Sequence, residues 1–190
     1  MLSKNLLFFF LFFFSSCFHT SDSNIKRASF KKFILKFKPL NYKSTINLDD
    51  SLLLKDSKEI NQNTPDTSFI KLSDNVRSFG YFKDTSNFFA FIYVVIGDEP
   101  EFRLITVNKR LEKINDVSLL NNNIPIYESK CVDVRKKIQI ENTNLIRSIT
   151  TISYFKCDSN DNLIKDNIIS KKISQTIIID LNGFISKTNL

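Results

Sequence analysis

The sequence predicts a mainly β (α+β) fold, an antiparallel meander of about six to eight strands with one short N-terminal helix packed on it. Residues 88–96 (FFAFIYVVI) are apolar on both alternations, which is typical of a central strand covered on both faces. Short apolar runs separated by polar turns continue from there to the end of the chain. The chain has 190 residues, of which 42% are hydrophobic, so it can bury the core of one domain.

The helix is predicted over residues 29–38, where Ser29 can cap its start and Pro39 can end it. Its apolar residues recur at helical spacing: Phe30, Phe33, Ile34 and Phe37. Its basic residues lie mostly off that stripe: Lys31, Lys32, Lys36 and Lys38. The Phe face either covers one side of the sheet or lies among lipid headgroups, with the lysines on anionic lipid. An aromatic stripe at this spacing usually packs in a core, which favours the first interpretation.

The remaining strands are predicted from β-forming runs between turn residues. Two early runs, 45–48 and 69–72, are candidates for short edge strands or for single turns. The later predicted strands are 102–107, 111–120, 131–141, 146–157, 168–180 and, after the Asn182-Gly183 turn, 184–185. Lysines at a sheet edge, such as Lys171 and Lys172, oppose pairing with another chain and therefore favour a monomer.

The runs 131–141 and 146–157 can be placed in register, and this register predicts a disulfide. In the first run the apolar residues share one face, while the charged residues share the other with Cys131. In this register the residue numbers of each opposite pair sum to 288. The expected opposite pairs are Val134 and Tyr154, Glu141 and Arg147, and Cys131 and Cys157. In an exported protein the cysteines predict a cross-strand bridge, closing a loop of about 27 residues and adding roughly 3 kcal/mol of stability. The alternative is a pair of free thiols.

The N-terminus has the features of an export signal. Lys4 precedes nine uncharged apolar residues, Leu6–Phe14, which are too few to span a hydrocarbon core as a helix. Ser15, Ser16 and Cys17 follow directly. Two small residues and a cysteine at this place resemble the lipobox of small uncharacterised bacterial lipoproteins, as found in Gram-negative bacteria with AT-rich genomes. The resemblance implies cleavage before Cys17 and a covalent lipid on it; the alternatives are an ordinary secretory signal or an uncleaved anchor.

The resemblance implies a lipoprotein signal peptide over 1–16 and a lipidated tether over 17–28, and the strand pattern predicts a single antiparallel-sheet domain over 29–190. It also implies a place in the cell envelope, at the outer membrane because Phe18 rather than Asp follows the cysteine. The net charge of +7 is spread along the chain and not concentrated on one element, which with the export signal argues against nucleic acid as a partner. The expected contacts are the membrane, through the lipid, and an envelope protein or glycan.

The sequence predicts no catalytic residue, no metal site and no cofactor besides the lipid. The single histidine, His19, lies in the predicted tether, and no glycine-rich phosphate loop is present. Carboxylates cluster at two places, Asp49-Asp50 and Asp98, Glu99 and Glu101. We interpret the second cluster as loop contacts for a binding partner. The alternative hypothesis is an exported carboxylate-dependent hydrolase, which needs two acids facing each other across a cleft.

Overall fold

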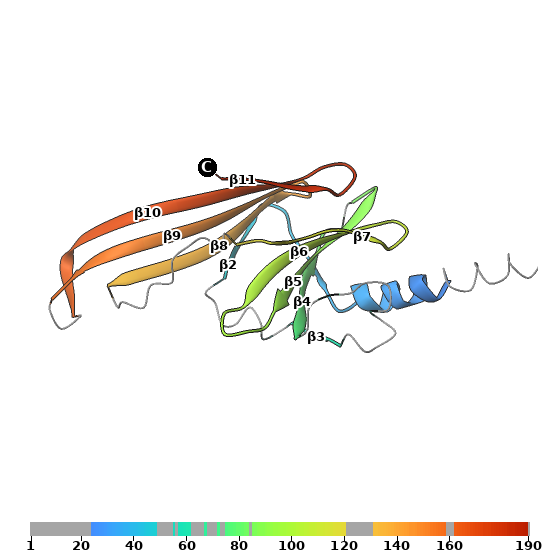
Figure 1. Ribbon diagram of the computed structural model, residues 1–190, viewed down its shortest axis with the longest axis horizontal. Coiled ribbons are helices and arrows are strands. Elements are labelled where there is room, and N and C mark those ends of the chain that lie inside the picture. Colours follow the sequence, from blue (N-terminus) through green and yellow to red (C-terminus); the bar gives the residue numbers. More distant parts are fainter. Residues whose placement is uncertain are drawn as a thin grey trace, which may run out of the picture.

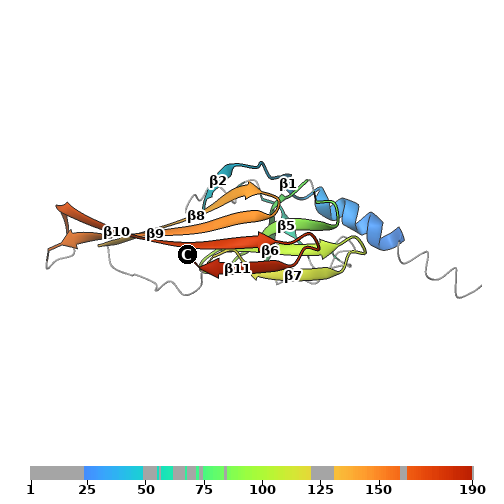
Figure 2. The ribbon, with the colours of Figure 1, turned by 90° about the horizontal axis from the view of Figure 1, so that it is seen from above.

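The computed structural model describes residues 24–48, 55, 57–61, 67, 72, 75–83, 85–120, 131–158 and 162–189. These residues form eleven strands in two sheets, which pack face to face (Figures 1 and 2). The mainly β prediction is therefore confirmed. The strands do not form one meander, however, because the chain crosses from the first sheet to the second after residue 118.

The first sheet has the order β1-β4-β5-β6-β7, with β3 also pairing with β4. Its strands are β1 (Lys38–Pro39), β3 (Glu59–Ile60), β4 (Val76–Tyr81), β5 (Phe88–Val95), β6 (Glu101–Asn108) and β7 (Lys113–Ser118). All the pairs are antiparallel except β1 with β4, which is parallel. The predicted strands 88–96, 102–107 and 111–120 thus correspond to β5, β6 and β7.

The second sheet has the order β11-β10-β9-β8-β2 and is antiparallel throughout. Its strands are β2 (Ser44–Asn47), β8 (Val132–Asn142), β9 (Leu145–Cys157), β10 (Leu163–Ile179) and β11 (Ile185–Asn189). The edge-strand interpretation of residues 45–48 is confirmed by β2, whereas residues 69–71 of the other candidate lie outside the described residues. The predicted Asn182-Gly183 turn joins β10 to β11, with Gly183 at a φ of +88° that favours glycine.

Two hydrophobic clusters cover the two faces of the first sheet. The cluster between the sheets includes Ala90, Ile92, Val94, Leu104, Ile138, Ile140, Ile146 and Ile177. The other cluster joins the outer face of the first sheet to the N-terminal helix and includes Phe33, Phe37, Phe91, Tyr93 and Ile105. β5 supplies residues to both clusters, as expected for a strand that is apolar on both alternations.

The N-terminal helix packs its aromatic stripe on the first sheet, which confirms the core interpretation of that stripe. Phe33 is fully buried, and its ring centroid lies 5.4 Å from that of Phe91. Phe37 lies 5.1 Å from the same ring, and Phe30 lies 4.5 Å from Phe89. Within the described residues, no helix is long and apolar enough to cross a lipid bilayer.

The predicted bounds of the helix are wrong at both ends. Residues 24–34 are helical, so residues 24–28 extend the helix into the predicted tether, and Ser29 is buried inside the helix instead of capping it. The helix ends early because the next residues join the sheet: Ser78 Oγ donates to the carbonyl of Lys36 at 2.6 Å, and Lys38 pairs with Gly80 in β1. Of the four predicted helix lysines, therefore, only Lys31 and Lys32 are helical.

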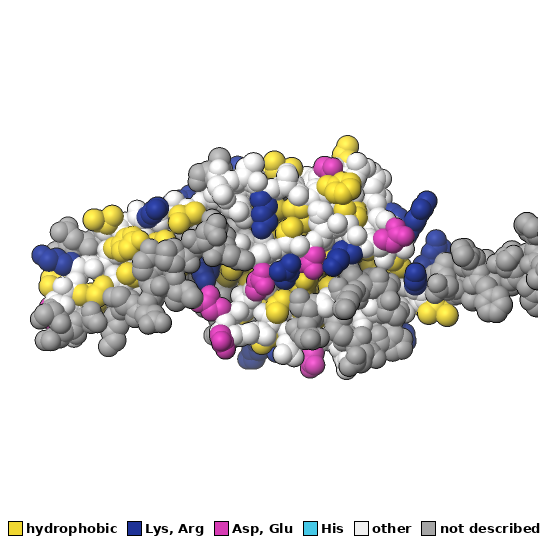
Figure 3. All heavy atoms as spheres, viewed as in Figure 1, with side chains coloured by type: hydrophobic (Ala, Val, Ile, Leu, Met, Phe, Trp, Pro, Cys, Tyr) yellow, Lys and Arg dark blue, Asp and Glu magenta, His cyan; other side chains and the backbone are white. Residues whose placement is uncertain are grey.

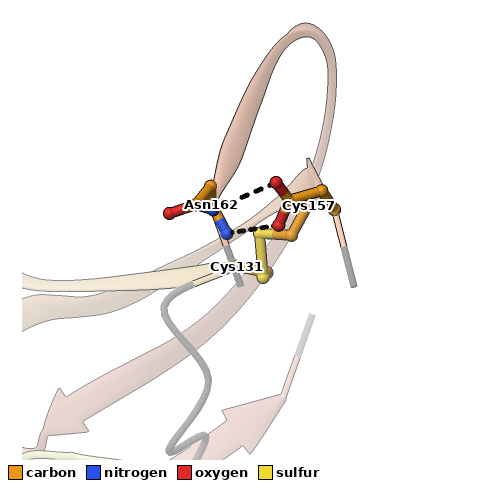
Figure 4. The surroundings of a disulfide bond; sticks show 4 residues. Cys131, Cys157 and Asn162 are labelled. Carbon is orange, nitrogen blue, oxygen red and sulfur yellow. Dashed lines mark hydrogen bonds between the residues drawn. A yellow bond between two sulfur atoms is a disulfide. The ribbon is translucent and has the colours of Figure 1, made fainter. Parts of the chain in front are cut away.

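The predicted register of β8 on β9 is wrong by two residues, but the predicted disulfide is present. Val132 lies opposite Tyr154, and the Phe155 amide donates to the Cys131 carbonyl at 2.7 Å. Cys131 reaches Cys157 diagonally, with a Cα–Cα distance of 5.9 Å (Figure 4). A shift of two residues preserves the face of every side chain, so both cysteines remain on one face.

The predicted pair of Glu141 and Arg147 also becomes diagonal. Arg147 lies opposite Gln139, yet its Nε is 3.6 Å from a Glu141 carboxylate oxygen. The cause of the shift is the irregular turn: Asn142 pairs with Leu145 after a bulge that follows the Ile140 pair.

Three strands of the second sheet extend beyond the sandwich as an arm, which we define as Cys131 with residues 132–136 of β8, 150–157 of β9 and 163–174 of β10 (Figures 1 and 2). In the described residues β2 pairs with β8 only over 137–140, and β11 pairs with β10 only over 175–179. The disulfide lies in the outer part of the arm, beside a turn closed by hydrogen bonds between Asp158 and Asn162 (Figure 4). The disulfide therefore ties the first residue of the arm to the end of β9.

Candidate binding surface

The predicted acidic contacts lie where β5 turns into β6. Asp98 and Glu99 are exposed in the turn, and Glu101 is the first residue of β6. Glu99 accepts from Lys136 Nζ at 3.2 Å, whereas Glu101 accepts from Arg103 Nη1 at 3.0 Å. The turn is thus attached by an ion pair to the base of the arm. Glu99 and Glu101 thus bind different cations, whereas Asp49 and Asp50 lie outside the described residues.

A polar cluster lies beside this turn, on three neighbouring strands of the first sheet. The Tyr93 hydroxyl donates to Asp116 at 2.9 Å, and Arg103 Nε donates to the same carboxylate at 2.9 Å. Burial, reinforced by the Asp116 charge, raises the pKa of Tyr93. Lys187 of β11 donates to the Ser118 carbonyl, and burial lowers the pKa of Lys187.

This cluster has the properties of a structural network. Tyr93 is fully buried and held in its protonated form, and the Arg103 guanidinium is bound by carboxylates on both sides. Each polar group therefore has a charged partner that compensates for its loss of water. The sequence did not predict the cluster, because its members are 10 and 13 residues apart and meet only through the β5–β6–β7 register.

A groove of about 780 Å³ runs along the base of the arm and is lined by residues from both faces of β8. Ile138 and Ile140 pack between the sheets, so the odd-numbered residues of β8 face outward. The groove is lined by Asn47, residues 133–137 of β8, and Thr151, Ser153 and Phe155 of β9. Its charged side chains are three cations and one acid, so the groove is basic.

Among the groove residues that form ion pairs, Arg135 carries the most accessible charge. Arg135 Nε lies 2.8 Å from Asp133 in an ion pair, and the Arg135 side chain is 78% exposed. Hydrophobic side chains gather on the arm as well (Figure 3), and those of Leu163, Ile164 and Ile169 in β10 are exposed. A projecting surface that combines basic, hydroxyl and apolar groups is suited to binding another macromolecule.

The N-terminal helix carries a second basic surface. Its exposed cations are Lys26, Arg27, Lys31 and Lys32. The sequence prediction missed Lys26 and Arg27 because it placed them in the tether. Lys36 follows the helix and is half-buried, and Lys38 is exposed in β1. The basic surface is therefore shifted toward the N-terminal end of the helix.

Several predicted features lie outside the described residues, including Cys17, the signal peptide and His19. In the part of the chain that the structure describes, no group of three or more His, Cys, Asp or Glu side chains could hold a metal ion. Comparison of the chain with protein-family models, with curated proteins and with solved structures found no match.

Proposed function

We propose that the chain is a non-catalytic lipoprotein of the cell envelope, anchored in the outer membrane through a lipid on Cys17, which presents the arm to an envelope protein or glycan. The observation that carries the proposal is the position of the two ends. The N-terminal helix and the arm lie at opposite ends of the long axis (Figures 1 and 2). A lipid attached seven residues before the described part of the helix would hold the arm away from the membrane.

The disulfide supports export. Disulfides persist in oxidising compartments such as the periplasm and the cell surface, and they are rare in the cytosol. The bond between Cys131 and Cys157 lies in the outer part of the arm, where the sandwich core does not brace the strands. A covalent link there keeps a thin, projecting element in shape, which a binding surface needs.

The charge of the N-terminal helix supports a place beside the membrane. Four cations are exposed on it, and residues 24–38 contain no Asp or Glu. Its aromatic face is already buried against the first sheet, so the contribution to membrane binding would come from charge and not from insertion. Each cation near an anionic leaflet adds about 1 kcal/mol to binding.

The contact surface of the proposed module combines the groove and the β5–β6 turn. Lys136 both lines the groove and binds Glu99. The groove therefore adjoins the acidic turn that the sequence predicts as a contact. Groups of both charges would then face a partner from one end of the molecule, which gives specificity of orientation.

Charge reversal in the helix tests the orientation. The chain carrying Cys17→Ser, and so without lipid, is mixed with vesicles of phosphatidylglycerol and phosphatidylcholine at low salt, and binding is measured by sedimentation. Lys31→Glu with Lys32→Glu is expected to weaken binding by at least about 2 kcal/mol, or roughly 30-fold, because two cations are lost from the membrane-facing surface and two anions are added.

The matched control is Lys171→Glu with Lys172→Glu, which reverses the same number of exposed charges on the arm. We expect this control to bind almost as strongly as the chain that carries Cys17→Ser alone. All the chains are expected to bind weakly to vesicles made only of phosphatidylcholine. Equal losses from the two double variants would contradict the proposed orientation.

A further inference from the structure

The turn between β10 and β11 presents two large apolar side chains to solvent. Leu181 and Phe184 are 74% and 58% exposed, whereas Gly183 between them is buried. Asp180 closes the turn, because its Oδ1 accepts from the amides of Asn182 and Phe184, both at 2.8 Å. The Asp180 carbonyl also accepts from the Gly183 amide at 3.1 Å. The turn therefore holds its two largest side chains outward in a fixed geometry.

Buried contacts anchor this turn to the first sheet. Thr106 of β6 is fully buried, and its Oγ1 donates to the Gly183 carbonyl at 2.6 Å. A Cβ atom at Gly183 would lie 2.8 Å from Ile114 of β7 and 3.0 Å from Phe88 of β5, so the turn packs directly on these two strands. The exposed pair thus projects from a firmly held part of the fold.

The first residues of β5 connect this turn to the N-terminal helix and to the β6–β7 turn. Phe88 packs against Gly183 in the core between the sheets. Its neighbour Phe89 belongs to the outer face, where its ring centroid lies 4.5 Å from that of Phe30 in the helix. Lys109 of the β6–β7 turn lies over the same Phe89 ring, with Nζ 3.8 Å from the centroid. The helix and the two turns therefore meet at one end of the molecule, away from the arm (Figure 1).

The surroundings of the exposed pair are basic. The β6–β7 turn and the start of β7 expose Lys109, Arg110 and Lys113 beside one acid, Glu112. The helix contributes four more exposed cations: Lys26, Arg27, Lys31 and Lys32. Cations that surround exposed leucine and phenylalanine side chains are complementary to a lipid surface, in which anionic headgroups lie over acyl chains.

We propose that the β10–β11 turn inserts Leu181 and Phe184 into the surface of the bilayer, while the neighbouring cations bind its anionic headgroups. The proposal rests on the orientation in the proposed function and adds an apolar contact with the same membrane. Insertion removes both side chains from water, which is the favourable contribution of an interfacial anchor. Because hydrogen bonds already fix the turn, little conformational entropy is lost on insertion.

A single tryptophan reports insertion directly, because the chain contains none. Phe184→Trp is made in the chain that begins at residue 17 and carries Cys17→Ser, so that neither signal peptide nor lipid takes part. With vesicles of phosphatidylglycerol and phosphatidylcholine that have brominated acyl chains, we expect a blue shift of the emission and quenching by bromine. Ile169→Trp is the control on the arm, and its emission is expected to be neither shifted nor quenched.

Removal of the apolar side chains tests their contribution to binding. Leu181→Ser with Phe184→Ser is expected to weaken binding to the same vesicles without bromine at least about tenfold, since burial of even one such side chain is worth that factor. The matched control is Leu163→Ser with Ile169→Ser on the arm, where the two side chains are 58% and 73% exposed. This control is expected to bind as the unaltered chain does. All four side chains are exposed, so neither change should impair folding.

A blue shift and quenching in the Phe184→Trp chain alone, with weaker binding of the turn variant alone, support insertion. An unshifted emission of that chain on vesicles, or equal losses from the two serine variants, would overturn it. The same blue shift without vesicles would also overturn it, because a second copy of the chain would then cover the turn. If Lys31→Glu with Lys32→Glu weakens binding and loss of the apolar pair does not, insertion alone fails and the proposed orientation stands. Quenching in the Ile169→Trp chain would contradict both.

Discussion

Phe33→Ala is expected to lower the free energy of unfolding by about 3–5 kcal/mol, the cost of removing a large aromatic side chain from a packed core. Phe33 is fully buried, and its ring lies 4.8 Å from Phe37 and 5.4 Å from Phe91 between centroids. The helix is about three turns long and has little stability of its own, so this contact holds it on the sheet. Urea unfolding, followed by circular dichroism, measures the change.

Leu35→Ala is the control for that experiment. Leu35 follows the helix directly and is 74% exposed, so its truncation is expected to change stability by less than about 0.5 kcal/mol. If Phe33→Ala were as mild as Leu35→Ala, the aromatic stripe would not be packed on the sheet. The lipid-facing interpretation of the stripe would then have to be considered again.

Asp116→Ala is expected to lower the free energy of unfolding by about 2–3 kcal/mol. The Asp116 carboxylate accepts from both Tyr93 and Arg103, and its removal leaves a buried hydroxyl and a half-buried guanidinium without their partner. Tyr93→Phe removes only the hydroxyl and is expected to cost less, about 1 kcal/mol, because no buried charge is stranded.

Titration of Tyr93 gives a second measurement of the same network. The folded pKa of Tyr93 is raised above the ordinary value of 10.0, first by burial and then by Asp116. The contribution of this group to stability is therefore present below pH 10 and is lost as the pH rises above 10, where the unfolded chain releases the proton first. Asp116→Ala should bring the pKa of Tyr93 closer to 10, as read from tyrosinate absorbance. An unchanged titration would contradict the hydrogen-bonded pair.

Local patterns predicted the features that local chemistry determines. The aromatic stripe identified the buried face of the helix, and the double apolar alternation identified β5 as the strand with a core on each side. The prediction that Cys131 and Cys157 lie on one face of the sheet gave their bond correctly, because a shift of two residues leaves each side chain on the same face. The predicted register of β8 on β9 was wrong, because a bulge near Asn142 changes how the hairpin closes.

Features that depend on distant contacts were not predictable from the sequence. β2 joins β8 across some 90 residues, and β1 joins β4 in parallel, so one predicted meander became two sheets. Ser29 lies inside the helix because residues 24–28 are helical too. The polar residues before Ser29 gave no indication of that extension. The Tyr93–Asp116–Arg103 network and the groove arise only when strands far apart in sequence lie side by side.

The central claim is that Cys17 carries a lipid and that Cys131 and Cys157 are joined in the exported protein. Its most direct test is the intact mass of the protein extracted from membranes, before and after reduction, beside a Cys17→Ser variant. We expect a chain that begins at Cys17 and carries acyl chains, a gain of two hydrogens on reduction, and a variant without acyl chains. A soluble wild-type protein whose mass contains no lipid would contradict the anchor, and an unchanged mass on reduction would contradict the disulfide.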